Sequence, residues 1–186
     1  MRRSIRRSSP NKALDVFAHL ASGALLGRFA RPQGEHWRAF ALFGAVAAVS
    51  PDVDAPLALF GHDVWATHHQ VYTHSLLGLV WVPALLASFP FRFAPWRTRY
   101  AVALAGWLLH VTLDFVANWP LPLLWPLTSE RHALLLLSQD FSWRLDMLLV
   151  TSLALCLWDG ALRHARAIVV ATAFILIAWL ALGFPT

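Results

Sequence analysis

The stretch YAVALAGWLLHVTLDFVAN, residues 100–118, is apolar along most of its length but carries a histidine and an aspartate towards its end. A membrane-spanning helix needs about 20 predominantly apolar residues, so this stretch is long enough to cross a bilayer. His110 and Asp114 stand four residues apart, which places both side chains on one helix face, one turn apart. The stretch therefore predicts an apolar helix that carries two polar groups side by side.

Five more apolar runs divide the rest of the chain. They cover residues 13–30, 37–50, 75–93, 144–159 and 165–184. The runs at 75–93 and 165–184 also have the length of a spanning helix. Those at 13–30 and 37–50 are marginal, and we expect them to be re-entrant or packed inside a bundle. The sequence therefore predicts an all-α fold, a polytopic membrane bundle of five to six helices.

The composition indicates a lipid environment. Hydrophobic residues make up 58% of the 186 residues and charged residues 13%, whereas soluble domains carry about 25% charged residues. The single cysteine, Cys156, excludes an intramolecular disulfide framework and a cysteine-rich metal site. The arginines cluster at the N-terminus and between the apolar runs, which fits lipid headgroups better than nucleic acid. We therefore expect membrane lipid as a partner and no direct binding of nucleic acid.

The chain divides into two parts. Residues 1–12 are basic and polar and predict a disordered arm, while residues 13–186 predict one membrane helical domain. Asp15, His19 and Arg28 interrupt the first apolar run, so we expect no cleaved signal peptide. The basic arm favours a cytoplasmic N-terminus in a multi-pass protein of the bacterial inner membrane, although the basic residues of the two sides nearly balance.

Carboxylates and imidazoles gather at one predicted face of the membrane. Counted along the chain from residues 13–30, the stretch at residues 100–118 is the fourth of six apolar runs. If successive helices alternate in direction, the starts of odd-numbered runs and the ends of even-numbered runs lie at the same membrane face. These positions carry Asp15, His19, Asp52, Asp54, His68, His69, His74, His110, Asp114, Asp140 and Asp146. The opposite face offers arginines and His36. Because ionisable groups within apolar helices pair, line a cavity or bind a ligand, the pattern predicts one polar site, which the orientation places towards the cytoplasm.

Three motifs contribute to this site, and each has a structural alternative. The segment PDVD, residues 51–54, has two carboxylates that would point the same way in an extended chain, towards one cation or a metal pair; the alternative is helix capping and turn formation. The HxxxD spacing of residues 110–114 suits two ligands of one zinc ion, or a ligand and its hydrogen-bond partner, but also a buried histidine paired with its own helix.

The third motif is HHQVYTHS, residues 68–75, at the junction of a loop and a helix. His69 and His74 are its predicted ligands and His68 a neighbour, while the alternative is an interfacial polar loop. His19 by itself is more typical of a satisfied core histidine than of a ligand. The convergence of four separate segments on one face, with only histidine and aspartate, favours a metal site over these alternatives.

The donor atoms define the predicted metal. Nitrogen and oxygen ligands without thiolate suit Zn²⁺, Mn²⁺ or Fe, and the number of imidazoles makes zinc the first choice, as one or two ions. The predicted ligands are His19, Asp52, Asp54, His69, His74, His110 and Asp114. Asp52 and Asp54 have a second predicted role, to orient or deprotonate the attacking water.

The order of these motifs resembles the YdjM-type inner-membrane proteins. His19, PDVD at 51–54, HQVYTHS at 69–75, HVTLD at 110–114 and LLWPL at 123–127 carry the resemblance, which runs from about residue 13 to residue 150. It implies a metal-dependent hydrolase. The chain departs from the family pattern at Gln70, where an arginine is usual, and this affects the handling of an anionic substrate more than metal binding.

A fainter similarity extends to the zinc-dependent phospholipase C and P1 nuclease group, which implies a phosphoester substrate. The further ligands of that group have no clear counterpart here, and His132 and Asp140 are the candidate substitutes. The predicted function is then hydrolysis of an ester or phosphoester, including a lipid-borne one, by metal-activated water. The alternatives are a non-catalytic, metal-stabilised membrane scaffold or interaction protein and, third, an ion or proton transporter, which would need polar groups on both faces.

Overall fold

The computed structural model describes residues 12–31, 36–116, 119–134, 148–153 and 164–181. Its helices are α1 (Lys12–Ala30), α2 (Trp37–Val49), the 3₁₀ helix η1 (Ser50–Phe60), α3 (His62–His68), α4 (Leu76–Ser88), α5 (Trp96–Val116) and α7 (Ala165–Ala181). Residues 148–153 are also helical. No strand occurs among these residues, apart from an isolated bridge between Leu121 and His132. The all-α prediction is confirmed, while most of the predicted N-terminal arm, Asp140 and Asp146 lie outside the described residues.

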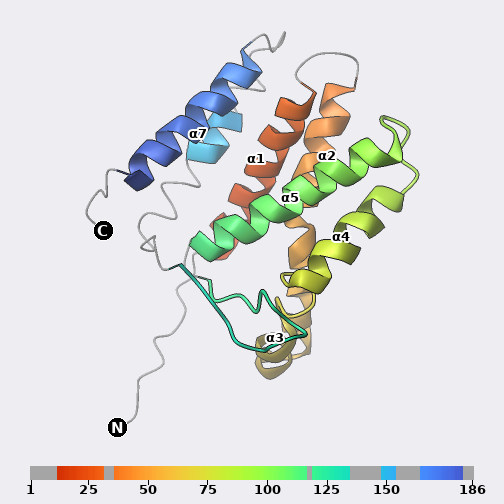
Figure 1. Cartoon of the computed structure of the whole chain (residues 1–186), viewed down its shortest axis with the longest axis vertical. Coiled ribbons are helices and arrows are strands. Elements are labelled where there is room, and N and C mark those ends of the chain that lie inside the picture. The colour runs from red at the N-terminus through yellow and green to blue at the C-terminus, as the bar shows by residue number, and fades with distance from the viewer. Residues whose placement is uncertain (1–11, 32–35, 117–118, 135–147, 154–163, 182–186) are drawn as a thin grey trace.

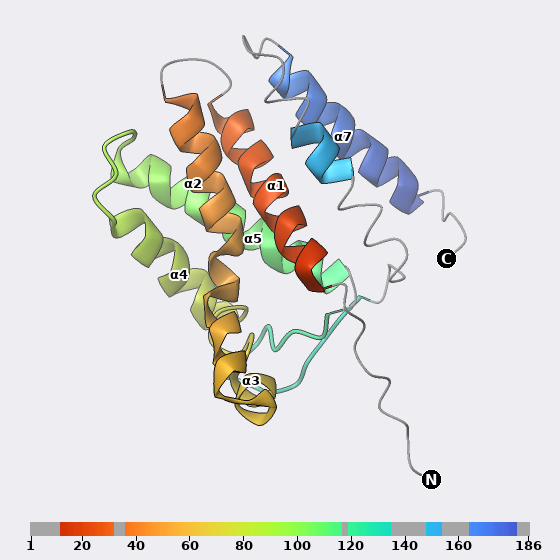
Figure 2. The ribbon, with the colours of Figure 1, turned by 180° about the vertical axis from the view of Figure 1, so that it is seen from behind.

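The helices form a bundle with α2 and α5 at its centre (Figures 1 and 2). Helix α2 packs against α1 and α5, and α5 also contacts α1 and α4, while α7 lies against α1. The end of α1 and the start of α2 lie at the same end of the bundle as the connection from α4 to α5 (Figure 1). Helix α3 and residues 119–134 lie at the opposite end.

Glycines bring α1 and α2 into close contact. A Cβ atom on Gly23 would collide with the carbonyl oxygen of Gly44, and one on Gly27 with the carbonyl oxygen of Phe40. Small residues at such crossings let two helix backbones approach closely, a common arrangement in membrane proteins. The close approach holds the first helix, and His19 on it, against the centre of the bundle.

One helical segment in the described part of the chain has the length and apolarity to cross a membrane. It is Trp37–Phe60, 24 residues formed by α2 and η1 together. The sequence indicated the runs at 75–93, 100–118 and 165–184 instead. Helix α4 ends at Ser88, two residues before Pro90, and has 13 residues. Helix α5 has 21 residues but includes Arg97, Arg99 and the polar pair, and the described part of α7 has 17 residues.

The geometry predicted for PDVD is wrong. Asp52 and Asp54 lie in η1, a 3₁₀ helix, rather than in an extended segment. Because a 3₁₀ helix has about three residues per turn, side chains two positions apart point to different sides. The two carboxylates therefore serve different partners, as described below.

Candidate metal centre

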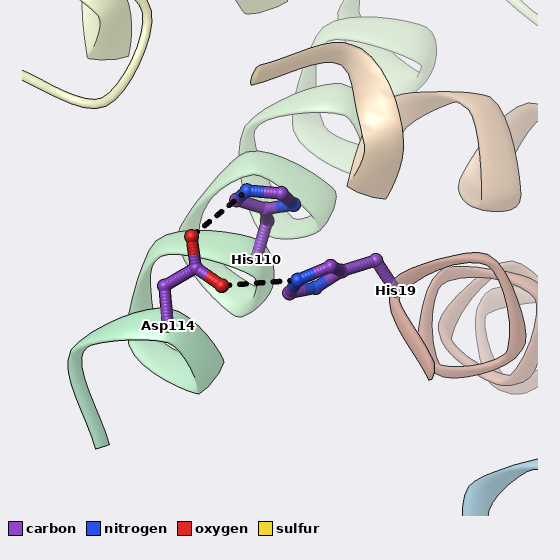
Figure 3. Close-up of side chains that lie close together, drawn as sticks. All are labelled: His19, His110 and Asp114. Carbon is purple, nitrogen blue, oxygen red and sulfur yellow. Dashed lines mark hydrogen bonds and ion pairs between the residues drawn. The ribbon is translucent and has the colours of Figure 1, made fainter. Parts of the chain in front are cut away.

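Four elements bring five predicted site residues together at one place in the bundle. His19 comes from α1, Asp52 from η1, His74 from the loop before α4, and His110 and Asp114 from the last turns of α5. All but Asp52 are buried, and His74 and His110 have no exposed surface. Figure 3 shows His19, His110 and Asp114, which converge from two helices. The predicted convergence of separate segments is confirmed for these five residues.

Four side-chain atoms in this group lie close to one another. The Nε2 atoms of His74 and His110 are 2.9 Å apart. Asp114 Oδ2 lies 3.4 Å from His74 Nε2 and 3.3 Å from His110 Nε2. Asp52 Oδ1 lies 3.5 Å and 3.6 Å from the same two nitrogens. We call Asp52, His74, His110 and Asp114 the four-donor cluster.

A backbone carbonyl fixes the orientation and tautomer of His110. Its Nδ1 atom lies 2.6 Å from the carbonyl oxygen of Ala48. Since a carbonyl can only accept, Nδ1 carries the proton and donates it. The other ring nitrogen, Nε2, then presents a lone pair to the cluster, as in histidines that bind metals while their second nitrogen donates to a carbonyl.

Thr73 and Asp54 do the same for His74. The Thr73 hydroxyl donates to Asp54 Oδ2 at 3.0 Å, because an ionised carboxylate only accepts. The Thr73 oxygen is therefore the acceptor in its 2.9 Å contact with His74 Nδ1. When the His74 ring is neutral, its Nε2 atom consequently also presents a lone pair to the cluster.

The donor set fits a tetrahedral metal ion. Two imidazole lone pairs at 2.9 Å, beside two carboxylates, need either a shared proton or a cation between them. Ligand atoms at about 2.0–2.1 Å from a tetrahedral Zn²⁺ would be about 3.3 Å from one another. Five of the six separations among the four atoms, all except that between the two carboxylate oxygens, are 2.9–3.6 Å and lie near this value.

His19 contacts the other oxygen of Asp114. Its Nε2 atom donates to Asp114 Oδ1 at 3.0 Å, and its ring stacks on His110 with centroids 3.8 Å apart. In the described structure its buried Nδ1 atom has no hydrogen-bond partner. His19, His110 and Asp114 form a second group with metal-ligand spacing. This group shares His110 and Asp114 with the four-donor cluster.

Asp54 and His69 lie beside the four-donor cluster and pair with each other. Asp54 Oδ1 accepts a hydrogen bond of 2.7 Å from His69 Nδ1, and Oδ2 accepts from the Gln70 backbone at 2.9 Å. With Thr73, three donors thus surround this carboxylate. Gln70, at the position where the family resemblance leads one to expect arginine, is buried, and its positive φ of 69° is rare for a residue with a side chain.

The remaining histidine candidates lie outside the cluster. His68 contacts the Tyr72 hydroxyl, at 3.5 Å, on the exposed side of the loop. His132 is 47% exposed, and its backbone pairs with Leu121. Two supporting groups, Thr73 and the Ala48 carbonyl, are not among the predicted site residues. The Thr-His pair of THS is the signal for the first, but a backbone carbonyl from another helix has no sequence signal.

Metal affinity is expected to fall as the pH falls. Burial alone would lower the pKa of His74, but its hydrogen bonds to Asp114 and Asp52 outweigh burial and raise the pKa to about 9. Below that pH, metal-free His74 carries a proton that an entering ion must displace. Each displaced proton weakens apparent zinc affinity about tenfold per pH unit of acidification. Competition titrations with a zinc-sensitive dye between pH 6 and pH 8 measure this slope, and a flat profile would contradict histidine ligation.

Comparison with known proteins identifies a family. The family model described as YdjM inner membrane protein matches residues 14–184, nearly the whole chain. No curated protein and no solved structure matches. The fainter similarity to the zinc-dependent phospholipase C and P1 nuclease group stays a prediction.

Proposed function

Because this chain belongs to the YdjM inner membrane protein family, we propose that it is a multi-pass inner-membrane protein that binds a divalent metal ion and hydrolyses an ester or phosphoester. Family membership supports the inner-membrane location. The segment Trp37–Phe60 supplies one candidate span. Apolar side chains on the outside of α2 and α7, such as Leu42 and Phe174, are exposed in the isolated chain, and lipid would cover them in a multi-pass arrangement.

The four-donor cluster is the observation that carries this proposal. Two imidazoles with fixed tautomers and two carboxylates converge from three separate elements of an apolar fold. Zinc is the first choice, because imidazole and carboxylate ligands without thiolate suit it, and Mn²⁺ or Fe is the alternative. Asp52, His74, His110 and Asp114 would hold the ion, with His19 orienting Asp114 or serving a second ion.

A divalent ion bound there supplies Lewis-acid activation for the hydrolysis of an ester or phosphoester. The protein side chains set where this chemistry takes place. Asp52 has 19% of its side chain exposed, whereas His74 and His110 have none, so solvent and substrate approach from the side of Asp52. A carboxylate in this position can also accept the proton of the attacking water.

Turnover of a generic phosphoester tests the hydrolase. Zinc-loaded wild-type protein in detergent is expected to hydrolyse bis(p-nitrophenyl) phosphate, and His74→Ala is expected to lower the rate at least about a hundredfold, because ligand loss removes the activating ion. His132→Ala, a histidine outside the cluster, is the control and should keep the wild-type rate. The assay follows released p-nitrophenolate.

The same assay separates the hydrolase from a structural metal site. The four-donor cluster joins η1 and α5 to the loop before α4, so a bound ion would also stabilise the bundle. A wild-type protein that binds zinc, gains thermal stability from it and hydrolyses no phosphomonoester or phosphodiester would support a non-catalytic scaffold and contradict the proposed enzyme.

A further inference from the structure

A loop formed by residues 119–134, here called the cross loop, passes over the end of the bundle where α3 lies (Figures 1 and 2). Backbone hydrogen bonds of 2.9 Å in both directions between Leu121 and His132 close it on itself. The Leu134 N–H donates to the Phe115 carbonyl, and Leu123 accepts from the Leu76 N–H. These bonds attach the cross loop to α5 and to the start of α4, next to the elements that carry the four-donor cluster.

Arg131 extends from the cross loop to the loop that carries the histidines. Its Nη1 atom donates to the Pro120 carbonyl at 3.3 Å, and its Nη2 atom to the His69 carbonyl at 3.4 Å. Both contacts are long, and the side chain is exposed. Among the described carboxylates, none lies within ion-pair distance of Arg131. A guanidinium group has five N–H donors, so it retains donors and an uncompensated charge for a ligand.

An anionic ligand needs a cation near the cluster, because the carboxylates there would otherwise repel it. Asp52, Asp54 and Asp114 lie within or beside the cluster. Arginines of the bundle gather instead at the other end, where α1 meets α2 and α4 meets α5: Arg28, Arg31, Arg38, Arg92, Arg97 and Arg99. Gln70, the residue after His69, is neutral and buried.

We propose that Arg131 binds a phosphate group of the ligand beside the four-donor cluster. This inference rests on the proposed function and names the chemistry that the site recognises. The guanidinium contacts the carbonyl of His69, whose ring lies 6.1 Å, centroid to centroid, from that of the cluster residue His74. Arginine forms paired, charge-assisted hydrogen bonds with phosphate oxygens. Arg131 thus places a positive charge beside His69, in the loop that leads to His74.

The phosphate can belong to a lipid headgroup or to a soluble phosphate compound. Apolar side chains near this end of the bundle favour an amphiphile: Leu127 is 82% exposed and Leu124 44% on the cross loop, and Phe60 is 75% exposed at the end of η1. The expected ligand is therefore phosphate attached to an apolar group, and the experiment below has one arm for each source.

Calorimetric titration of the zinc-loaded protein with inorganic phosphate tests the role of Arg131. Arg131→Gln is expected to weaken phosphate binding at least about tenfold, the scale of one charge-assisted interaction, with unchanged zinc content and thermal stability. Arg131→Lys should recover part of the affinity because it keeps the charge. Arg97→Gln, an exposed arginine at the other end of the bundle, is the matched control and should bind phosphate as the wild type does.

The outcomes separate this inference from the proposed function. If the wild-type protein binds no zinc, the proposed metal centre fails. If zinc is bound but phosphate affinity is absent in the wild type, or equal in wild type and Arg131→Gln, the assignment of Arg131 is overturned while the metal centre stands. In the second arm, nanodiscs with phosphatidic acid are compared with nanodiscs of phosphatidylcholine alone. If nanodiscs with phosphatidic acid weaken the binding of inorganic phosphate to the wild-type protein and phosphatidylcholine nanodiscs do not, the phosphate belongs to a lipid headgroup. Loss of this competition in Arg131→Gln supports the assignment of Arg131.

Discussion

Replacing Asp114 by alanine is expected to abolish metal binding and to destabilise the folded protein. One oxygen of this buried carboxylate accepts from His19, and the other faces both His74 and His110. Its removal takes away one ligand and leaves three buried imidazoles without their common anion. The loss of one partner of a buried charged pair typically costs about 3–5 kcal/mol of unfolding free energy.

Elemental analysis and thermal unfolding of the purified protein measure both effects. Metal content should fall from near one ion per chain to background, and the unfolding temperature should drop. Asp63→Ala is the matched control, because Asp63 is a fully exposed carboxylate on α3. An Asp114→Ala protein that keeps its metal and its unfolding temperature would show that Asp114 is neither a ligand nor the centre of the polar cluster.

Gly44→Leu is expected to cause the largest loss of fold. A Cβ at residue 44 would collide with the carbonyl oxygen of Gly23, and a backbone group cannot move aside as a flexible side chain can. The two helices must separate, at a cost of about 3 kcal/mol or more for an overpacked contact. Because α1 carries His19, separation also removes this histidine from Asp114.

Val46→Leu is the control for this substitution. Val46 lies on the same helix but is 44% exposed, so an added methylene meets no backbone there. Size-exclusion chromatography and thermal unfolding in detergent should give wild-type behaviour for Val46→Leu, and aggregation or a much lower unfolding temperature for Gly44→Leu. Equal stability of the two variants would contradict the close crossing of α1 and α2.

The helices and the gathering of polar groups could be predicted from the sequence for simple physical reasons. Apolar runs separated by polar and proline-rich segments define the helices, and α1, α2 and α5 begin and end within a few residues of the expected positions. Alternation of direction then brings His19, Asp52 and His110 to one end. Both inferences depend on local composition and on chain direction, which a sequence contains.

The roles of the individual carboxylates could not be predicted, because they depend on the backbone of residues 50–60. An extended PDVD would have sent both aspartates to one ion, whereas η1 turns Asp52 to the four-donor cluster and Asp54 to His69. The contact of Arg131 with the His69 carbonyl joins positions 62 residues apart through the path of the cross loop. The length of the membrane-compatible segment also escaped prediction, since η1 continues α2 beyond Pro51.

In the proposed metal centre, His74, His110, Asp52 and Asp114 hold one metal ion together. Anomalous diffraction at the zinc absorption edge, from crystals of protein purified without chelator, tests this most directly. We expect a peak about 2.0–2.2 Å from Nε2 of His74 and of His110 and from an oxygen of Asp52 and of Asp114. A peak between Asp54 and His69, or no peak near the two Nε2 atoms in zinc-replete crystals, would contradict it.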